Sequence, residues 1–118
     1  MKVSHYSKAE ATLEVPGVLK RVVIGAEDGA PNFCMRVFDV EPGSSTPYHT
    51  HPWEHEVFVL SGKGVVVDAG KKETEVSGKT VVYVAPDEPH CFTNIGADTL
   101  RFICLIPNSA QTGVCNTK

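Results

Sequence analysis

The sequence has no apolar run that approaches the roughly 18 residues needed to span a membrane as a helix. It also has no basic excess, because 11 Lys and Arg residues stand against 14 Asp and Glu residues, for a formal net charge of −3. That balance provides no basic surface for nucleic acid or anionic lipid. The N-terminal stretch MKVSHYSKAE lacks the apolar segment of a signal peptide. We therefore expect a cytoplasmic protein that binds neither nucleic acid nor membranes.

Cysteine pairs with metal-binding spacing are also missing. The four cysteines, Cys34, Cys91, Cys104 and Cys115, are far apart, and no two of them form a CxxC motif. This spacing excludes a zinc ribbon and does not indicate a disulfide. In a chain without a secretion signal, such cysteines are typically reduced thiols that pack as small hydrophobic side chains.

Helix patterns are nearly absent, whereas short blocks rich in Val, Ile and Phe recur along the chain. Apolar residues in these blocks repeat with period two or run continuously, and Gly, Pro, Asp and Asn clusters separate the blocks. The expected strands are residues 19–25, 32–40, 55–60, 64–69, 74–77, 79–85, 90–94 and 99–106. A chain of 118 residues is long enough for one domain with a core. The pattern predicts a single all-β domain, a sandwich or a barrel, followed by a polar C-terminal tail at 108–118.

Several of the expected strands are apolar on both faces, as in the segments FVL, VVVDA, VVYVA and FICLI. An apolar surface on the outside of so small a protein has to be covered. The simplest cover is a second copy of the same chain, so we expect a homodimer.

Histidine is concentrated in one stretch, HTHPWEH at 49–55, which holds three of the five histidines in the chain. Side chains two residues apart in a strand share a face, so His49 and His51 point the same way if the segment is extended. His55 begins the next expected strand, and His90 stands at the head of a later one. A bend after His51 could bring all four rings together.

Imidazole rings carry two nitrogens that each need a partner, and an unpaired buried polar group costs roughly 1–3 kcal/mol. A metal ion satisfies one nitrogen of each ring. The alternative is that these histidines are exposed loop residues with no common role. For an isolated HxH pair the two interpretations are about equal, but the third histidine and His90 favour a metal site.

Two segments resemble the signatures of the cupin superfamily. GSSTPYHTHPWEHEVFVLSG is similar to the first signature, with Gly43, His49 and His51 in place and His55 at the ligand position three residues later. Glu56 fits only the longer spacing of that signature, and Gly62 then comes one residue early.

The second segment, VSGKTVVYVAPDEPHCFTN, is similar to the second signature, with Gly78, His90 and Asn94 in the matching roles. It departs from the signature at Ala85 and Asp87, which replace a proline and a glycine, and its spacing after Gly78 is one residue longer.

The resemblance implies a cupin double-stranded β-helix, a jelly-roll barrel with one divalent transition metal in its lumen. The segments are similar to the small cupins with four histidine ligands, which implies a ligand set of His49, His51, His55 and His90 and manganese as the expected metal. Iron, zinc, nickel and copper stay open, because imidazole suits all of them. We expect residues 1–30 to form N-terminal strands and dimer contacts, and residues 31–107 to form the barrel.

Strand parity predicts which neighbours of the ligands face the lumen. If His55 points inward, Val57 and Val59 also point inward, while Glu56 and Phe58 point outward. On the last strand Phe102, Cys104 and Ile106 share one face, and the resemblance suggests that this face lines the metal cavity. Arg36 could meet an anionic substrate there, or it could be a surface residue on an edge strand.

Two functions remain in view. Four neutral imidazoles leave the full charge on the metal, and a six-coordinate ion would keep two positions for substrate or dioxygen. This arrangement suits a Mn- or Fe-dependent dioxygenase or related oxidoreductase that acts on a small organic molecule. The alternative is a non-catalytic cupin that binds a metal or a metabolite. No carboxylate can be placed as a general base, and no hydrolytic triad is present.

Overall fold

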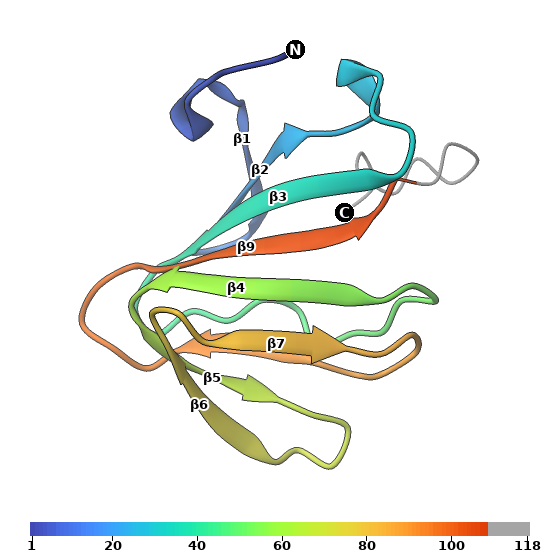
Figure 1. The fold of residues 1–118 in the computed structure, drawn as a ribbon. Coiled ribbons are helices and arrows are strands. Elements are labelled where there is room, and N and C mark those ends of the chain that lie inside the picture. The colour runs from blue at the N-terminus through green and yellow to red at the C-terminus, as the bar shows by residue number, and fades with distance from the viewer. Residues whose placement is uncertain (109–118) are drawn as a thin grey trace.

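Residues 1–108 are described by a computed structural model, in which nine strands form two antiparallel sheets (Figure 1). The strands are β1 (Ala11–Val15), β2 (Val18–Ile24), β3 (Phe33–Val40), β4 (His55–Ser61), β5 (Lys63–Val67), β6 (Glu73–Ser77), β7 (Val81–Val84), β8 (Cys91–Asn94) and β9 (Leu100–Pro107). Two short 3₁₀ turns, Tyr6–Lys8 and Ala26–Asp28, complete the regular structure. Within this part of the chain no helix is long and apolar enough to cross a membrane.

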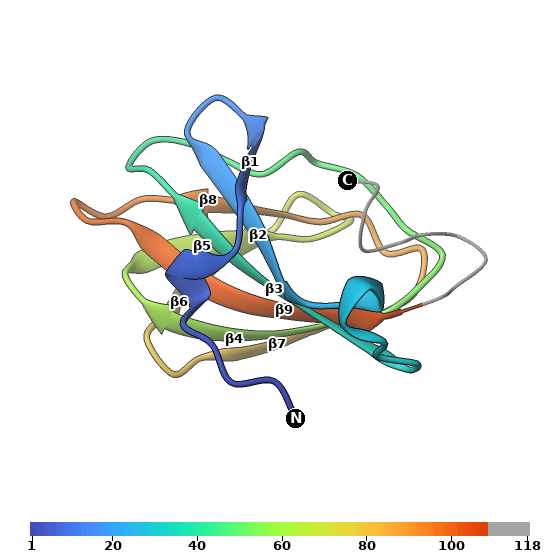
Figure 2. The same ribbon diagram turned by 90° about the horizontal axis from the view of Figure 1, so that it is seen from above.

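The larger sheet has the order β1-β2-β3-β9-β4-β7 and the smaller one the order β6-β5-β8 (Figure 2). The two sheets enclose a core that includes the stacked rings of Phe38, Phe92 and Phe102. The expected all-β single-domain barrel is therefore confirmed. The N-terminal strands β1 and β2 extend the same sheet as β3, so residues 1–30 are continuous with the barrel.

All eight expected strands are present, with ends shifted by one or two residues, and β1 is a ninth that the pattern did not predict. This short edge strand pairs only with β2, and its Leu13 side chain is exposed. It therefore lacks the buried alternating positions by which the other strands were found. The polar tail expected at 108–118 lies, apart from Asn108, outside the described residues.

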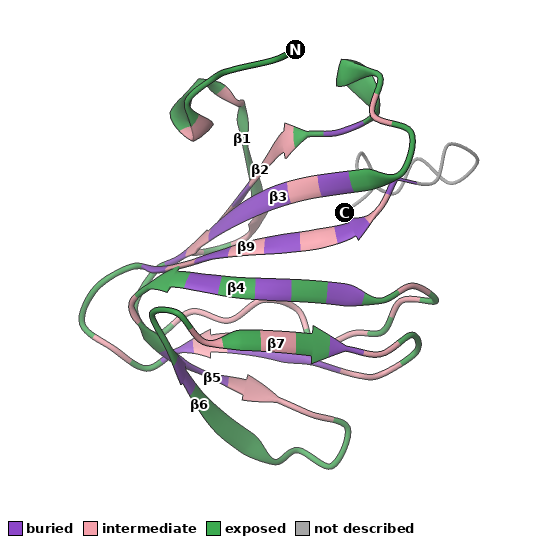
Figure 3. Cartoon of the chain, in the orientation of Figure 1, coloured by how far each residue is buried: buried purple, intermediate pink, exposed green. Residues whose placement is uncertain are grey.

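Burial along β4 follows the parity prediction (Figure 3). His55, Val57 and Val59 are buried, whereas Glu56 and Phe58 are exposed. Strand β9 alternates in the same way, with its buried side chains belonging to the core. The turn after β4 needs the signature glycine, because Gly62 has φ +95° and a Cβ there would lie 2.5 Å from the Thr99 carbonyl oxygen. Cys91 and Cys104 are buried free thiols, as expected. Cys34 is disulfide-bonded, so the expectation of a reduced thiol is wrong at that position, and Cys115 lies outside the described residues.

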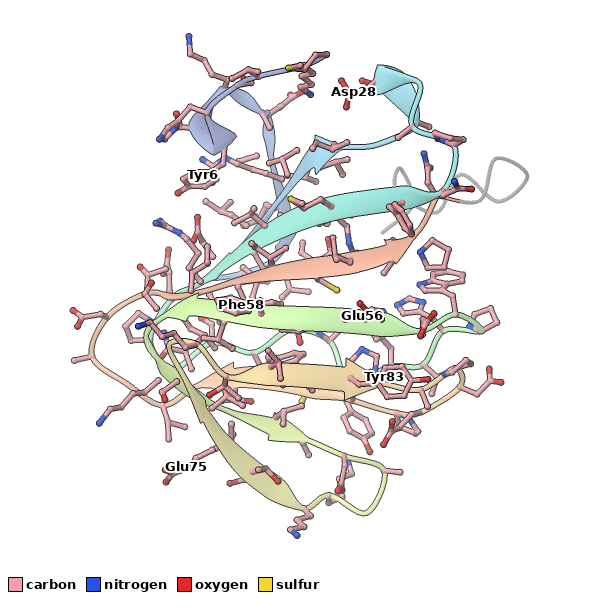
Figure 4. The ribbon with its side chains drawn as sticks, viewed as in Figure 1. Tyr6, Asp28, Glu56, Phe58, Glu75 and Tyr83 are labelled. Carbon is pink, nitrogen blue, oxygen red and sulfur yellow. The ribbon has the colours of Figure 1, made fainter. Side chains whose placement is uncertain are left out.

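The outer face of the large sheet carries a mostly apolar patch around Phe58 and Tyr83, which the exposed Glu56 borders (Figure 4). The patch comprises Phe58 and Leu60 on β4, Val81 and Tyr83 on β7, and Ile103 and Leu105 on β9. Tyr83 is 60% and Val81 70% exposed. A contiguous exposed apolar face of this kind is typical of an interaction surface. The homodimer expected from the sequence would cover this patch, because a twofold axis places the same face of two copies against itself.

We expect sedimentation velocity at micromolar concentration to give a dimer, and Phe58→Asp to shift it to monomer, because a charge at the centre of the patch would have to be desolvated on association. Ile95→Asp is the matched control, since Ile95 is exposed in the loop between β8 and β9, away from the patch. A monomeric wild-type protein at that concentration contradicts the prediction.

Candidate functional site

The fold brings together the four histidines that the sequence singled out. The segment before β4 runs antiparallel to the start of β8, where the backbone amides of His49 and His90 donate to each other's carbonyl oxygens at 3.2 and 3.1 Å. His51 follows two residues later, and His55 is the first residue of β4. The ring centroids of His49 and His51 are 4.3 Å apart, those of His55 and His90 4.7 Å, and those of His51 and His55 5.2 Å.

The nitrogens of two rings are already at the spacing of neighbouring metal ligands. Nε2 of His49 and Nε2 of His51 are 3.2 Å apart. Two nitrogens bound to one ion at about 2.1 Å and at a right angle would lie about 3 Å apart. Nδ1 of His90 donates to the Glu88 carbonyl oxygen at 2.9 Å, which leaves the lone pair on Nε2.

His55 is the most enclosed of the four rings, with 4% exposure, and its Nδ1 is buried without a hydrogen-bond partner. Burial, together with the positive charge that His90 and Arg36 can carry, lowers the pKa of His55 to about 3. Burial also lowers the pKa of His90. Both rings are therefore neutral at physiological pH, the form in which imidazole binds metals.

These donors fit a divalent transition metal in number and type, and the orphaned Nδ1 of His55 is a polar atom that a bound ion or ligand would satisfy. The rings do not yet have the mutual geometry of a complete ligand set. Among residues 1–108, no group of three His, Cys, Asp or Glu side chains is already arranged around one point at ligand distances. Small rotations of rings 4–6 Å apart would be needed to close the set.

A cavity of about 40 Å³ lies beside the four rings. It is also lined by Glu14, Arg36, Phe38, Thr46, Pro47, Val57, Phe92, Phe102 and Cys104. Of the six side chains that the sequence suggested for such a cavity, Arg36, Val57, Phe102 and Cys104 contact it. The other two, Val59 and Ile106, do not line it. They face inward as expected, but they are packed into the hydrophobic core.

Arg36 is a lumen residue, so the surface interpretation of this arginine is wrong. It is 6% exposed, because register places it beside Cys104 in the middle of the large sheet. Its Nη2 donates to Sγ of Cys104 at 3.0 Å, and its guanidinium lies 5.0 Å from the ring centroid of Phe38. Its Nε is buried and has no hydrogen-bond partner. Burial raises the pKa of the Cys104 thiol, so that side chain is neutral.

Sequence reasoning missed Glu14 as a cavity residue, because β1 itself was not predicted. Glu88, two residues before His90, does not use its carboxylate on a ligand ring. The Glu88 side chain accepts from the Ala85 amide at 3.0 Å, and only its backbone carbonyl reaches a ligand ring. Trp53 stacks on His51 with ring centroids 4.6 Å apart.

The lowered pKa of His55 predicts that the metal-free protein loses stability in mild acid. Above pH 6.5 the ring is neutral in both the folded and the unfolded chain. Between pH 6.5 and about 3 only the unfolded chain takes up the proton, so unfolding becomes easier as pH falls. The expected loss from His55 is about 2 kcal/mol at pH 5, and urea unfolding of the wild type and of His55→Gln at pH 7.5 and 5 measures it. An equal loss in both proteins would rule out this origin.

Comparison with known proteins agrees with the fold described above. Residues 36–106 match the cupin domain family. The polyketide cyclase RemF from Streptomyces resistomycificus is 32% identical, with a TM-score of 0.85 over 92% of this chain and 80% of that one. A protein from Thermotoga maritima described as a predicted oxalate decarboxylase is 25% identical, with a TM-score of 0.77 over 92% of this chain and 100% of that one.

An oxalate-binding protein from Thermotoga maritima is 35% identical over 66 residues, which are 55% of this chain and 54% of that protein. The matched segment thus spans about half the length of this curated relative. The family match covers more than half of the chain and contains Arg36 and all four histidines. The chain belongs to the cupin domain family.

Proposed function

We propose that this cupin is a metal-dependent enzyme that acts on a small enolisable carbonyl compound, whose negatively charged oxygen is held between the four histidines and Arg36. The observation that carries the proposal is the buried guanidinium of Arg36, which lines the same cavity as neutral imidazoles. Among residues 1–108, no carboxylate lies within ion-pair distance of it. A buried charge of this kind requires an anionic partner, and a bound ligand would supply one.

The proposed ligands of the cation are His49, His51, His55 and His90, and manganese is the metal that we propose. A divalent cation bound there would act as a Lewis acid that polarises a carbonyl group and makes the neighbouring C–H more acidic. Replacing a carboxylate ligand by a fourth imidazole keeps the positive charge on the ion, which favours anionic oxygen ligands.

The chain itself supplies binding and the exclusion of water. Arg36 presents hydrogen-bond donors of fixed geometry to a carboxylate or an enolate oxygen. Phe38, Phe92 and Phe102 form an apolar wall, in which such charge-assisted hydrogen bonds are stronger than in water. The cavity of about 40 Å³ admits only a few non-hydrogen atoms, so the reacting end of a larger substrate would enter it.

Similarity to a polyketide cyclase favours a reaction without net oxidation, such as closure of a ring by an enolate carbon on a carbonyl. Oxygenation of an enol is the second candidate, supported by the apolar wall and by a set of four imidazoles, which would leave two positions of a six-coordinate ion for substrate and dioxygen. Similarity to an oxalate-binding protein supports the non-catalytic alternative, in which the same groups hold a small dicarboxylate.

The experiment loads the protein with Mn²⁺, Fe²⁺ or Zn²⁺ and offers 1,3-dicarbonyl compounds, enols and alkenylphenols. Substrate loss is followed by NMR, and oxygen by an electrode. Conversion without oxygen uptake supports the proposal, and conversion with uptake supports the dioxygenase. Tight binding of oxalate with no conversion of any compound would favour the binding protein instead.

A further inference from the structure

Glu14 faces the cavity from the first hairpin. Thr12 on β1 pairs with Lys20 on β2, whose side chain is buried, so Glu14, two residues after Thr12, points to the same inner face. Leu13 pairs with Leu19 and Val15 with Val18, so a bulge at Glu14 shifts the register and turns Val15 to the inner face as well. Leu13 is 64% exposed, whereas the Glu14 side chain is only 6% exposed. An edge strand therefore holds a carboxylate on the inner face of the sheet.

The Glu14 carboxylate forms a buried ion pair with a lysine. Oε1 of Glu14 lies 3.4 Å from Nζ of Lys20, and the Lys20 side chain is also 6% exposed. Lys20 is flanked on the inner face of β2 by Val18 and Val22, and it pairs across the sheet with Phe38. A buried ion pair is weak evidence for stability, because apolar replacements are often neutral or better. Its place beside a cavity makes it a candidate for function.

Glu14 lines both the cavity beside the histidines and an open cleft on the surface. It lines the cavity that contains the four histidines and Arg36. It also lines an open cleft between the first hairpin and residues 25–28, together with Glu10 and Lys20. We propose that Glu14 is the proton-transferring residue of the barrel, which removes the proton next to the substrate carbonyl and passes it to water in the cleft. This inference rests on the proposed function.

The step balances without any oxidant or reductant. The C–H bond beside the carbonyl breaks, its electron pair becomes part of the enolate, and a new O–H bond forms on Glu14. The carboxylic acid then returns its proton to water in the cleft, or to the carbon in the reverse direction. Lys20, whose Nζ lies 3.4 Å from Oε1 of Glu14, holds the carboxylate in place, and Arg36 holds the anionic end of the substrate away from Glu14.

The test uses the Zn²⁺-loaded full chain and two probes. Pyruvate in D₂O reports proton removal, because exchange of its methyl protons is followed by NMR. Oxalate, a rigid analogue of the pyruvate enolate, reports binding by calorimetry without any proton transfer. We expect Glu14→Gln to slow deuterium exchange at least about 100-fold, the range of general-base catalysis, with metal content unchanged. Its affinity for oxalate should stay within about threefold of the wild type or become tighter.

Glu10→Gln is the matched control, because Glu10 borders the cleft but not the cavity. It should exchange pyruvate at the wild-type rate. If Glu14→Gln does not fold because it leaves Lys20 unpaired, the double variant Glu14→Gln/Lys20→Met removes both buried charges and takes its place. A contact readout independent of turnover is the side-chain carboxylate ¹³C signal, which should shift on oxalate addition for Glu14 and not for Glu10.

The outcomes separate the role of Glu14 from the proposed function on which it rests. Exchange at the wild-type rate in the Glu14 variants overturns the role of Glu14 and leaves the proposed function standing. Oxalate binding without pyruvate exchange in the wild-type protein also overturns the role of Glu14, and it favours the binding protein. If the loaded wild type neither binds oxalate nor exchanges pyruvate, the inference and the proposed function both fail.

Discussion

His55→Ala is expected to remove the bound metal while leaving the barrel folded. The wild type, purified without added metal and analysed by elemental mass spectrometry, should carry close to one divalent ion per chain, and the variant almost none. Loss of a residue that only supports a ligand already costs 10- to 100-fold in metal affinity, so loss of a ligand should cost at least about 100-fold. His55 is buried at the start of β4, so no solvent-exposed side chain can replace its ring.

The fold should survive this change, because the hydrophobic cluster that joins the two sheets does not include a histidine. Far-ultraviolet circular dichroism of the variant should retain the β-sheet spectrum. His5→Ala is the control, since His5 is exposed near the N-terminus and should leave metal content unchanged. Equal metal content in wild type and His55→Ala would refute the assignment of His55 as a ligand.

Arg36→Met is expected to lower the affinity for anionic ligands strongly while leaving the metal content unchanged. Methionine keeps an unbranched chain of similar length against Phe38 but removes the charge. Loss of one member of a buried charge pair typically costs 2–5 kcal/mol. Calorimetry of the Zn²⁺-loaded protein should therefore show oxalate binding weakened by a factor of roughly 30 or more.

Two variants make the Arg36 result specific. Arg101→Met removes an arginine that pairs with Asp39 on the outer face of the sheet, with Nε to Oδ1 at 2.6 Å, and it should bind oxalate like the wild type. Arg36→Lys keeps the charge without the planar donor pair and should restore part of the affinity. Unchanged oxalate binding in Arg36→Met would mean that the anion lies elsewhere.

Much of this architecture could be predicted because it depends on local periodicity. Alternation along β4 correctly separated inward Val57 from outward Phe58, since one face of the strand packs into the barrel and the other faces out. The histidines could be singled out because their spacing matches strand geometry, and in the fold each ring centroid lies within 4.7 Å of that of another histidine of the set. Their occupation by a metal stays a prediction.

Other parts of the site depend on register between distant strands, which one sequence does not contain. Arg36 is buried because β3 lies between β2 and β9, where Val22 and Cys104 flank it. Glu14 was missed because it lies on β1, the edge strand that the apolar pattern did not predict. Val59 and Ile106 have the right parity, but parity cannot tell a cavity wall from the packed core beside it.

X-ray absorption at the metal edge of the protein as purified tests the central claim most directly, namely that imidazoles from both histidine segments bind one ion and leave positions for a substrate. The account predicts a six-coordinate first shell with four imidazole nitrogens and two lighter-atom ligands from solvent, the latter replaced when oxalate is added. A protein that binds no metal, or a metal held by no more than two imidazoles, would contradict it.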